Sequence, residues 1–224
     1  RCEELISSNL HTKFPNHSIL GEEQGAQASA GNSPYKWVID PLDGTTNYVH
    51  RVPVFATSIA LLKHDQPVLG VVHSAPLGRT YTAVAGQGAF MQSAPLHASV
   101  TSQLNESLVA TGVPYDRATT DKNNINYISH LTPLVRGIRR MGAAALDMCF
   151  VAEGIYDAYW ELKVRLWDIA AGILIAREAG ATVSYLSIDD NYTYDIICAA
   201  PRLYNPLLEE LHTVASDFET LQLK

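Results

Sequence analysis

The sequence has few cysteines, and their arrangement does not indicate a cross-linked or zinc-bound fold. Its 224 residues include three, Cys2, Cys149 and Cys198, with no Cys-x-x-Cys pair among them. Disulfide frameworks use even numbers of cysteines, and structural zinc sites use closely spaced pairs. We therefore expect neither kind of site, and a reducing, cytoplasmic compartment fits this composition best.

The sequence also lacks long apolar runs and basic clusters. No run approaches the roughly 20 consecutive apolar residues that cross a bilayer, and the first ten residues, RCEELISSNL, lack the apolar core of a signal peptide. The formal net charge is −7, and no block of Lys or Arg offsets it. We therefore expect a soluble protein with neither a membrane nor a nucleic acid as its main partner. A phosphate site would need positive charge from elsewhere.

What the chain does contain is enough apolar sequence for a large core. Hydrophobic residues make up 47% of it and charged residues 17%, a balance that predicts one globular domain or two closely joined ones. The pattern changes from strand-like to helical near Gly142. We therefore expect a single domain over 1–224 with two closely joined halves, about 1–140 and 141–224.

The first segment has the spacing of an amphipathic helix. In CEELISSNLHTKF, apolar residues recur at the helical period, at Leu5, Ile6, Leu10 and Phe14. The pattern is already under way at residue 2. We therefore expect the helix to begin before the first residue and an N-terminal segment to be missing from the sequence.

Strand-like runs dominate the rest of the first half. The run YKWVID is expected to stop at Pro41, which has no N–H for a sheet hydrogen bond. After it come further β-rich runs separated by turn residues: FATSIALL at 55–62, PVLGVVHS at 67–74, RTYTAVA at 79–85 and SLVATG at 107–112. This order predicts a largely antiparallel meander.

The second half alternates helices and strands. Residues 143–154 and 167–180 each have a helical pattern that ends at a glycine. The second helix is apolar almost all round, which is typical of a helix enclosed between other layers. Strands are expected at YDAYW, ATVSY and YDIICAAP, and a closing helix at NPLLEELHTV.

The stretch WVIDPLDGTTNYVH places two carboxylates and an anion-binding turn in direct succession. Asp40 ends a strand, and Asp43 follows after Pro41. Two close carboxylates repel each other unless hard cations such as Mg²⁺ lie between them. Gly44 and Thr45 come next, where backbone amides at a helix start can hold an anion. The order suits a metal ion shared between protein and phosphate, although an ordinary Asp-Gly turn explains this pentapeptide alone about as well.

Three other carboxylates lie at the ends of predicted elements. Glu22 follows a short strand-like run in GEEQG, Asp168 opens the apolar helix, and Glu161 ends the strand YDAYWE. Each also has a simpler explanation. Glu22 can belong to a solvated acidic turn, Asp168 can cap its helix, and Glu161 can balance Lys163 or Arg165 at the surface.

Taken together, these segments resemble the inositol monophosphatase family. The resemblance rests on four motifs and covers nearly the whole chain: GEE at 21–23, WVIDPLDGTTNYVHRVP at 37–53, GAAALDMCFVAEGIYDAYWE at 142–161 and WDIAAGILIAREAG at 167–180. It implies a mixed α/β (α+β) fold, arranged as a layered αβαβα sandwich. The family usually has a Gly-containing turn after residues 181–184, where this chain continues with YLSIDDNYTYD.

The resemblance also assigns roles to particular residues. The implied ligands of two or three Mg²⁺ ions are Glu22, Asp40, Asp43, Asp168 and the Leu42 carbonyl. The implied catalytic residues are Glu22, Thr45 and Asp40, with a metal-activated water as the nucleophile. The implied substrate-binding residues are Asp43, Gly44, Thr45, Ala144, Glu161 and Asp168.

The function that this resemblance implies is hydrolysis of myo-inositol monophosphate to inositol and phosphate. The alternatives are another sugar or polyol phosphate (fructose bisphosphate, galactose phosphate or histidinol phosphate) on the same site, or a catalytically silent metal-binding homologue. A glycosidase would also use paired carboxylates, but without divalent cations. The resemblance further implies a homodimer and sensitivity to lithium. The expected partner is a small phosphate monoester.

Overall fold

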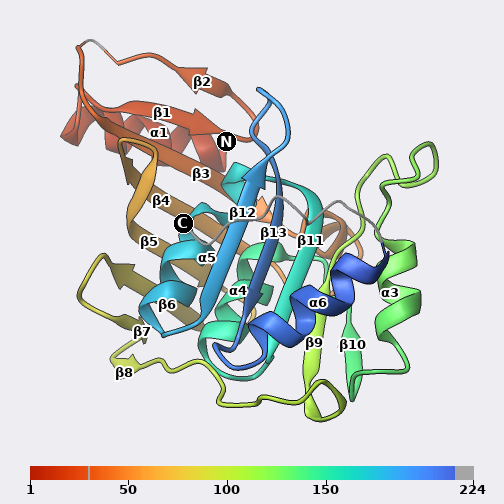
Figure 1. Ribbon diagram of the computed structural model, residues 1–224. Coiled ribbons are helices and arrows are strands. Elements are labelled where there is room, and N and C mark those ends of the chain that lie inside the picture. Colours follow the sequence, from red (N-terminus) through yellow and green to blue (C-terminus); the bar gives the residue numbers. More distant parts are fainter. Residues whose placement is uncertain (30, 215–224) are drawn as a thin grey trace.

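Five alternating layers of helix and sheet make up the computed structural model, which describes residues 1–29 and 31–214 (Figure 1). The larger sheet contains β1 (Ser18–Gly21), β2 (Gly25–Gln27), β3 (Tyr35–Asp43), β4 (Ala56–Lys63), β5 (Gln66–Ser74), β6 (Arg79–Val84), β7 (Ala89–Met91) and β8 (Ala94–Pro95). Its strand order is β2-β1-β3-β4-β5-β6-β7-β8. The smaller sheet contains β9 (Leu108–Thr111), β10 (Gly137–Arg139), β11 (Ala158–Arg165), β12 (Thr182–Ser187) and β13 (Thr193–Ala199), in the order β10-β9-β11-β13-β12.

Helices fill the space between the sheets and cover their outer faces. Both α4 (Ala144–Ala152) and α5 (Leu166–Glu178) contact the larger and the smaller sheet. The outer face of the larger sheet is covered by α1 (Cys2–Lys13), and that of the smaller by α3 (Ile125–Leu131) and α6 (Tyr204–Val214). The αβαβα sandwich expected from the sequence is therefore confirmed.

The hydrophobic pattern explains the layers. In α5 every residue from Ile169 to Ala176 is buried, as a helix with apolar residues on all sides requires. Successive residues of β13 face opposite sides: Ile196 packs into the core that contains α4 and α5, and Ile197 into the core under α3 and α6. A strand buried on both faces needs such a continuous apolar run. Gly154 and Gly180 follow their helices in the left-handed conformation, as predicted.

One part of the predicted meander is wrong. Strands β3 to β6 do pair antiparallel in sequence order, but β9, predicted as the next strand, belongs to the smaller sheet and runs parallel to β10 and β11. Its residues Val109 and Ala110 are fully buried, which is typical of a parallel strand covered on both faces. The change of sheet falls between Pro95 and Leu108. The two halves divided near residue 140 stay a prediction.

Among the described residues, no helix is both long and apolar enough to cross a membrane. The cysteines are free thiols, with Cys149 and Cys198 buried and Cys2 exposed. The segment YLSIDDNYTYD forms the β12–β13 hairpin, in which Ser187 pairs with Tyr194.

Candidate active site

Asp40 and Asp43 reach the same cavity because β3 carries an extra residue between them. Asp40 pairs with Ser58 of β4 and Asp43 with Ala56, so three steps along β3 oppose two along β4. Regular pleating would send residues three apart to opposite faces, whereas a bulge restores them to one side. The prediction that β3 ends at Pro41 is therefore wrong: the bulge accommodates its missing N–H and the strand continues to Asp43.

The turn after Asp43 brings a helix start to the cavity. Gly44 has φ +88°, and a Cβ there would lie 2.9 Å from the Val54 carbonyl oxygen, so the position requires glycine. The short helix α2 (Thr45–Val49) begins directly after it. Its first backbone amides have no acceptor within the helix, and the Thr45 hydroxyl donates to the Leu42 carbonyl over 3.0 Å.

Hydrogen bonds tie this turn to the start of α4 and to the segments at Val54 and Met141. The Asn47 side-chain amide donates to the Val54 and Met141 carbonyls, both at 2.7 Å. Asp43 Oδ2 accepts the Ala145 backbone N–H at 2.8 Å, at the first turn of α4. A carboxylate is favoured at a helix N-terminus, where unpaired amides point outward. The bond to Ala145 places the neighbouring Ala144 beside Asp43.

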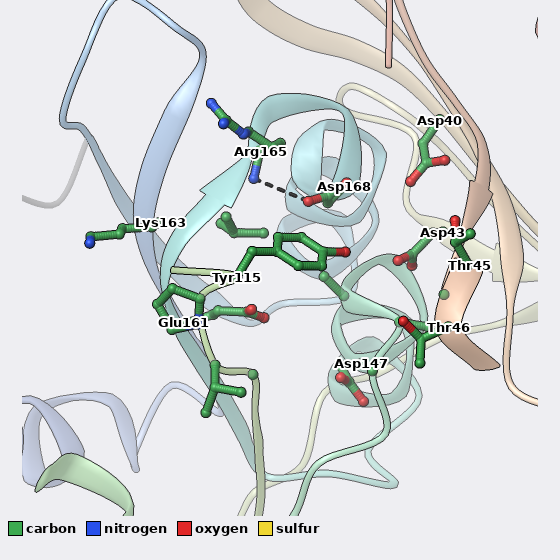
Figure 2. Close-up of a pocket in the computed structure, with 18 of the residues that line it drawn as sticks. Asp40, Asp43, Thr45, Thr46, Tyr115, Asp147, Glu161, Lys163, Arg165 and Asp168 are labelled. Atoms are coloured by element: carbon green, nitrogen blue, oxygen red, sulfur yellow. Dashed lines mark hydrogen bonds between the residues drawn. The ribbon is translucent and has the colours of Figure 1, made fainter. Parts of the chain in front are cut away.

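The structure brings all the predicted site residues to one cavity between the two sheets. Figure 2 shows Asp40, Asp43 and Thr45 on one wall and Glu161 across from them, with Asp168 at the start of α5. The predicted residues that line this cavity are Glu22, Asp40, Leu42, Asp43, Gly44, Thr45, Ala144, Glu161 and Asp168.

The carboxyl groups in the cavity suppress each other's ionisation. Burial, followed by the charges of Asp168 and Glu22, raises the pKa of Asp40 to about 10. Burial and the charge of Asp40 raise the pKa of Asp43 well above its usual value, and burial with the charge of Asp43 does the same for Asp168. Burial also raises the pKa of Glu22, against a smaller opposing effect of Asp40. Without cations, this group of acids is costly to charge.

Asp168 serves its helix as well as the cavity. It lies in the first turn of α5, and its Oδ2 accepts the Arg165 backbone N–H at 3.1 Å (Figure 2). Asp168 therefore caps the helix from its third position, with Arg165 as the N-cap residue, and is not itself the N-cap considered from the sequence. The carboxyl nevertheless lines the cavity, so the two roles do not exclude each other.

Glu161 is not a surface charge at a strand end. It lies within β11 and accepts a hydrogen bond from the Tyr159 hydroxyl, while Lys163 pairs with Asp116 instead. The strand continues to Arg165 through a bulge after Glu161, so its predicted end at this residue is wrong. Burial raises the pKa of Glu161. A Cβ at Gly112 would lie 2.1 Å from its carboxyl carbon, so only glycine leaves room for this side chain.

A buried acid on α1, which the sequence reading missed, holds the turn that carries Glu22. Glu3 is completely buried, and its two oxygens accept the backbone N–H groups of Glu23 and Gln24, both at 2.9 Å. The predicted apolar face of α1 is wrong at Leu5, which is 66% exposed. Glu3 lies on the same face of the helix as Ile6 and Leu10, so the helical period is the signal in the sequence that marks it as buried.

The donor set fits hard cations although the side chains do not enclose one. Within residues 1–29 and 31–214, no three His, Cys, Asp or Glu side chains stand close enough together to surround an ion. Several buried carboxyl groups that share one cavity nevertheless form the oxygen-rich, charge-deficient site that Mg²⁺ prefers. The roles of the individual ligands therefore stay predictions.

Sequence reasoning also missed several residues that line the cavity: Tyr115, Arg140, Asp147, Lys163 and Arg165. In Figure 2 the Tyr115 ring projects into the cavity toward Asp43. No motif or period marks this loop residue in the sequence.

Comparison with known proteins agrees with this geometry. A family model described as the inositol monophosphatase family matches residues 1–216. The chain belongs to the inositol monophosphatase family. A Synechocystis protein named inositol-1-monophosphatase is 44% identical over 184 residues, which are 82% of this chain and 64% of that protein. The chain thus spans a little under two thirds of that relative's length.

Matches to other relatives cover more of the chain. The Escherichia coli Nus factor SuhB is 36% identical over 218 residues, 96% of this chain and 81% of that protein. The solved structure of inositol monophosphatase from Anabaena matches with a TM-score of 0.90 at 38% identity, covering 95% of this chain and 85% of that one.

We predict that Asp40→Asn flattens the pH dependence of stability in the metal-free protein. Because the pKa of Asp40 is raised in the folded state, its protonated carboxyl group contributes to the free energy of unfolding. That contribution is complete below about pH 4 and is lost as pH rises through about 10. The free energy of unfolding should therefore fall from pH 5 to pH 9, and fall less steeply in the variant, by at most about 1.4 kcal/mol per pH unit. Urea denaturation in EDTA measures this.

Asp189→Asn is the matched control for that experiment. Burial of Asp189 is outweighed by hydrogen bonds from Asn191 and Thr193, which lower its pKa, so it is ionised in both states from pH 5 to pH 9. Its variant should keep the wild-type slope. Equal slopes in wild type and Asp40→Asn would contradict the raised pKa.

We also predict that Glu3→Gln loosens the turn that carries Glu22. Glutamine has one acceptor oxygen where the turn offers two N–H donors, so one buried donor loses its partner. The free energy of unfolding should fall by about 1–3 kcal/mol, and the amides of Glu23 and Gln24 should exchange with deuterium faster. Glu4→Gln, at an exposed neighbour, should change neither; equal behaviour of both variants would contradict the role of Glu3.

Proposed function

We propose that the protein is a Mg²⁺-dependent phosphomonoesterase that hydrolyses myo-inositol monophosphate to inositol and phosphate. The observation that carries this proposal is the convergence of every predicted site residue on one cavity, where acidic side chains face the start of a helix. Membership of the inositol monophosphatase family supports it.

The acidic wall of the cavity suits two or three Mg²⁺ ions. Their ligands would be Glu22, Asp40, Asp43 and Asp168, with the Leu42 carbonyl. When bound, the cations neutralise the phosphate oxygens, activate water and stabilise the leaving alkoxide. They would also relieve the carboxylate repulsion that raises the pKa of Asp40. This supplies the positive charge that the acidic composition lacks.

The phosphate would lie against the start of α2. The backbone amides of Gly44 and Thr45 would donate hydrogen bonds to the phosphate oxygens. The positive φ of Gly44 sets the direction of these amides. Asp43 is fixed by its bond to the Ala145 amide. The phosphorus is therefore held in one orientation relative to the attacking water.

Glu22 and Thr45 would prepare that water for attack. The Thr45 hydroxyl proton is committed to the Leu42 carbonyl, so its oxygen is free to accept a hydrogen bond from the water. Glu22 has a raised pKa, and a base whose pKa approaches the working pH accepts a proton more effectively. The water proton would move to the Glu22 carboxylate as the new P–O bond forms and the P–O bond to the alcohol breaks, and the departing alcohol oxygen would take up a proton from solvent.

The leaving group would be bound on the opposite side of the cavity. Glu161 stands there with one oxygen held by the Tyr159 hydroxyl, and a carboxylate accepts hydrogen bonds from vicinal hydroxyls. Ala144 offers a small surface on which a ring can pack. A polyol therefore fits this side better than an apolar alcohol.

The other predictions made from the sequence remain proposals. The relatives carry two kinds of name, inositol-1-monophosphatase and Nus factor SuhB, and the physiological substrate is part of the proposal. The alternative substrates are fructose bisphosphate, galactose phosphate and histidinol phosphate. A homodimer and lithium sensitivity rest on family resemblance, and a cytoplasmic location rests on the cysteine composition.

We predict that the full-length protein hydrolyses inositol 1-phosphate only with Mg²⁺ present. Phosphate release should disappear in EDTA and return with excess Mg²⁺, because the carboxylates alone repel the anionic substrate. Asp40→Asn, which removes one proposed ligand, should lose at least about 100-fold in kcat. Turnover that persists in EDTA would contradict the proposal.

We predict that Glu161→Gln reduces selectivity for polyols. Its kcat/KM for inositol 1-phosphate should fall about 10-fold relative to 4-nitrophenyl phosphate, which has no ring hydroxyls, because one charge-assisted bond contributes about 1.5–3 kcal/mol. Equal losses on both substrates would indicate a disturbed metal site. No loss on either would exclude Glu161 from substrate binding.

A further inference from the structure

One buried acid in the cavity has no partner and no role in the mechanism above. Asp147 lies on α4 with 1% of its surface exposed, and its Oδ1 makes no hydrogen bond to the described residues. The side chain lines the same cavity as Asp43 and Glu161 (Figure 2). Buried polar atoms without a partner are rare, because each lowers stability.

Nothing in the fold explains why an aspartate stands here. Asp157 is the instructive contrast: it is 8% exposed, its Oδ1 accepts the Ser99 hydroxyl at 2.6 Å, and its Oδ2 accepts the Leu108 amide at 2.7 Å. Asp157 thus joins two segments of chain. Asp147 joins none, and alanine in its place would favour the helix.

The surroundings of Asp147 match a neutral polyhydroxy ligand. Burial, then the charges of Glu161 and Asp43, raises the pKa of Asp147 well above its usual value, against a smaller opposing effect of Arg140. A protonated carboxyl group both donates and accepts a hydrogen bond, as a hydroxyl group does. A second anionic group on the ligand would instead meet Glu161 nearby.

The position of Asp147 is fixed relative to the phosphate side of the cavity. It lies one turn along α4 from Ala144, on the same face of the helix, and the first turn of α4 is bound to Asp43. Glu161 comes from β11, a different element of the cavity wall. The two acids can therefore bind different hydroxyls of one ring.

We propose that Asp147 hydrogen-bonds a hydroxyl of the leaving group and, together with Glu161, makes the site selective for monophosphates of uncharged polyols. This rests on the proposed phosphatase function and adds to it a specificity-determining residue. Asp147 reduces stability in the free protein and recovers its hydrogen bonds only when a polyhydroxy ring is bound.

The experiment compares Asp147→Ala and Asp147→Asn with Asp157→Asn in the full-length protein. For each variant, kcat and KM with Mg²⁺ are measured for inositol 1-phosphate and for 4-nitrophenyl phosphate, and Tm is measured without substrate. In Asp147→Ala, kcat/KM for inositol 1-phosphate divided by kcat/KM for 4-nitrophenyl phosphate should fall at least 10-fold. The fall should come mainly from a higher KM for inositol 1-phosphate. The amide in Asp147→Asn should restore part of that ratio.

The Tm separates a binding role from a structural one. Asp147→Ala should raise Tm by about 2–4 °C, because it removes an unpaired buried group. Asp157→Asn should lower Tm and leave the ratio of the two substrates unchanged. A lower Tm in Asp147→Ala, or losses that are equal on both substrates, would overturn the proposal in favour of a structural role.

The wild type distinguishes the failure of this proposal from that of the proposed function. Wild-type enzyme without Mg²⁺-dependent hydrolysis of inositol 1-phosphate would overturn the function and the role of Asp147 together. Wild-type enzyme that prefers the polyol, with the same preference retained in Asp147→Ala, would overturn only the role of Asp147.

Discussion

The constraint on which the rest of the site depends is the repulsion among buried carboxyl groups. Asp40, Asp43 and Asp168 all have their pKa raised by burial and by one another. Each also accepts a backbone N–H, from Leu42, Ala145 and Arg165 respectively. These hydrogen bonds favour the charged form and so partly oppose the repulsion. The fold thus holds the acids in place without neutralising them, which is the task that the proposed cations would take.

The two central helices are arranged around this constraint. Both α4 and α5 lie between the sheets, and the N-terminal turn of each is bonded to one of the acids. The partial positive charge of a helix N-terminus stabilises a carboxylate beside it, by about 0.3–1 kcal/mol at exposed sites and up to about 2 in partly buried ones. Because the apolar bodies of the helices are buried against both sheets, the ends of the helices cannot shift easily. Core packing therefore determines where the charges stand.

The sequence predicted the layers and the site residues better than the local geometry. A helix as apolar as 167–180 is stable only between other layers, which predicts its central position. The order of residues from Asp40 to Thr45 by itself suggests a metal ion shared with a phosphate. The bulge after Asp40 was not predictable, because Pro41 in a strand usually marks its end. Glu161 was placed at a strand end for a similar reason, since β11 continues only through a second bulge. Glu3 was missed because a buried acid depends on a tertiary contact, here with the amides of Glu23 and Gln24.

In the proposed mode of binding, the two sides of the cavity use different means of recognition. On the phosphate side the contacts come from backbone: the bulge of β3, the left-handed Gly44 and the start of α2. Backbone geometry is fixed by the fold and tolerates little substitution. On the leaving-group side the contacts come from side chains on separate elements, Glu161 on β11 and Asp147 on α4. Exchange of one such side chain alters the hydrogen bonds to the alcohol without moving the phosphorus, so this scaffold can keep its reaction while its substrate changes.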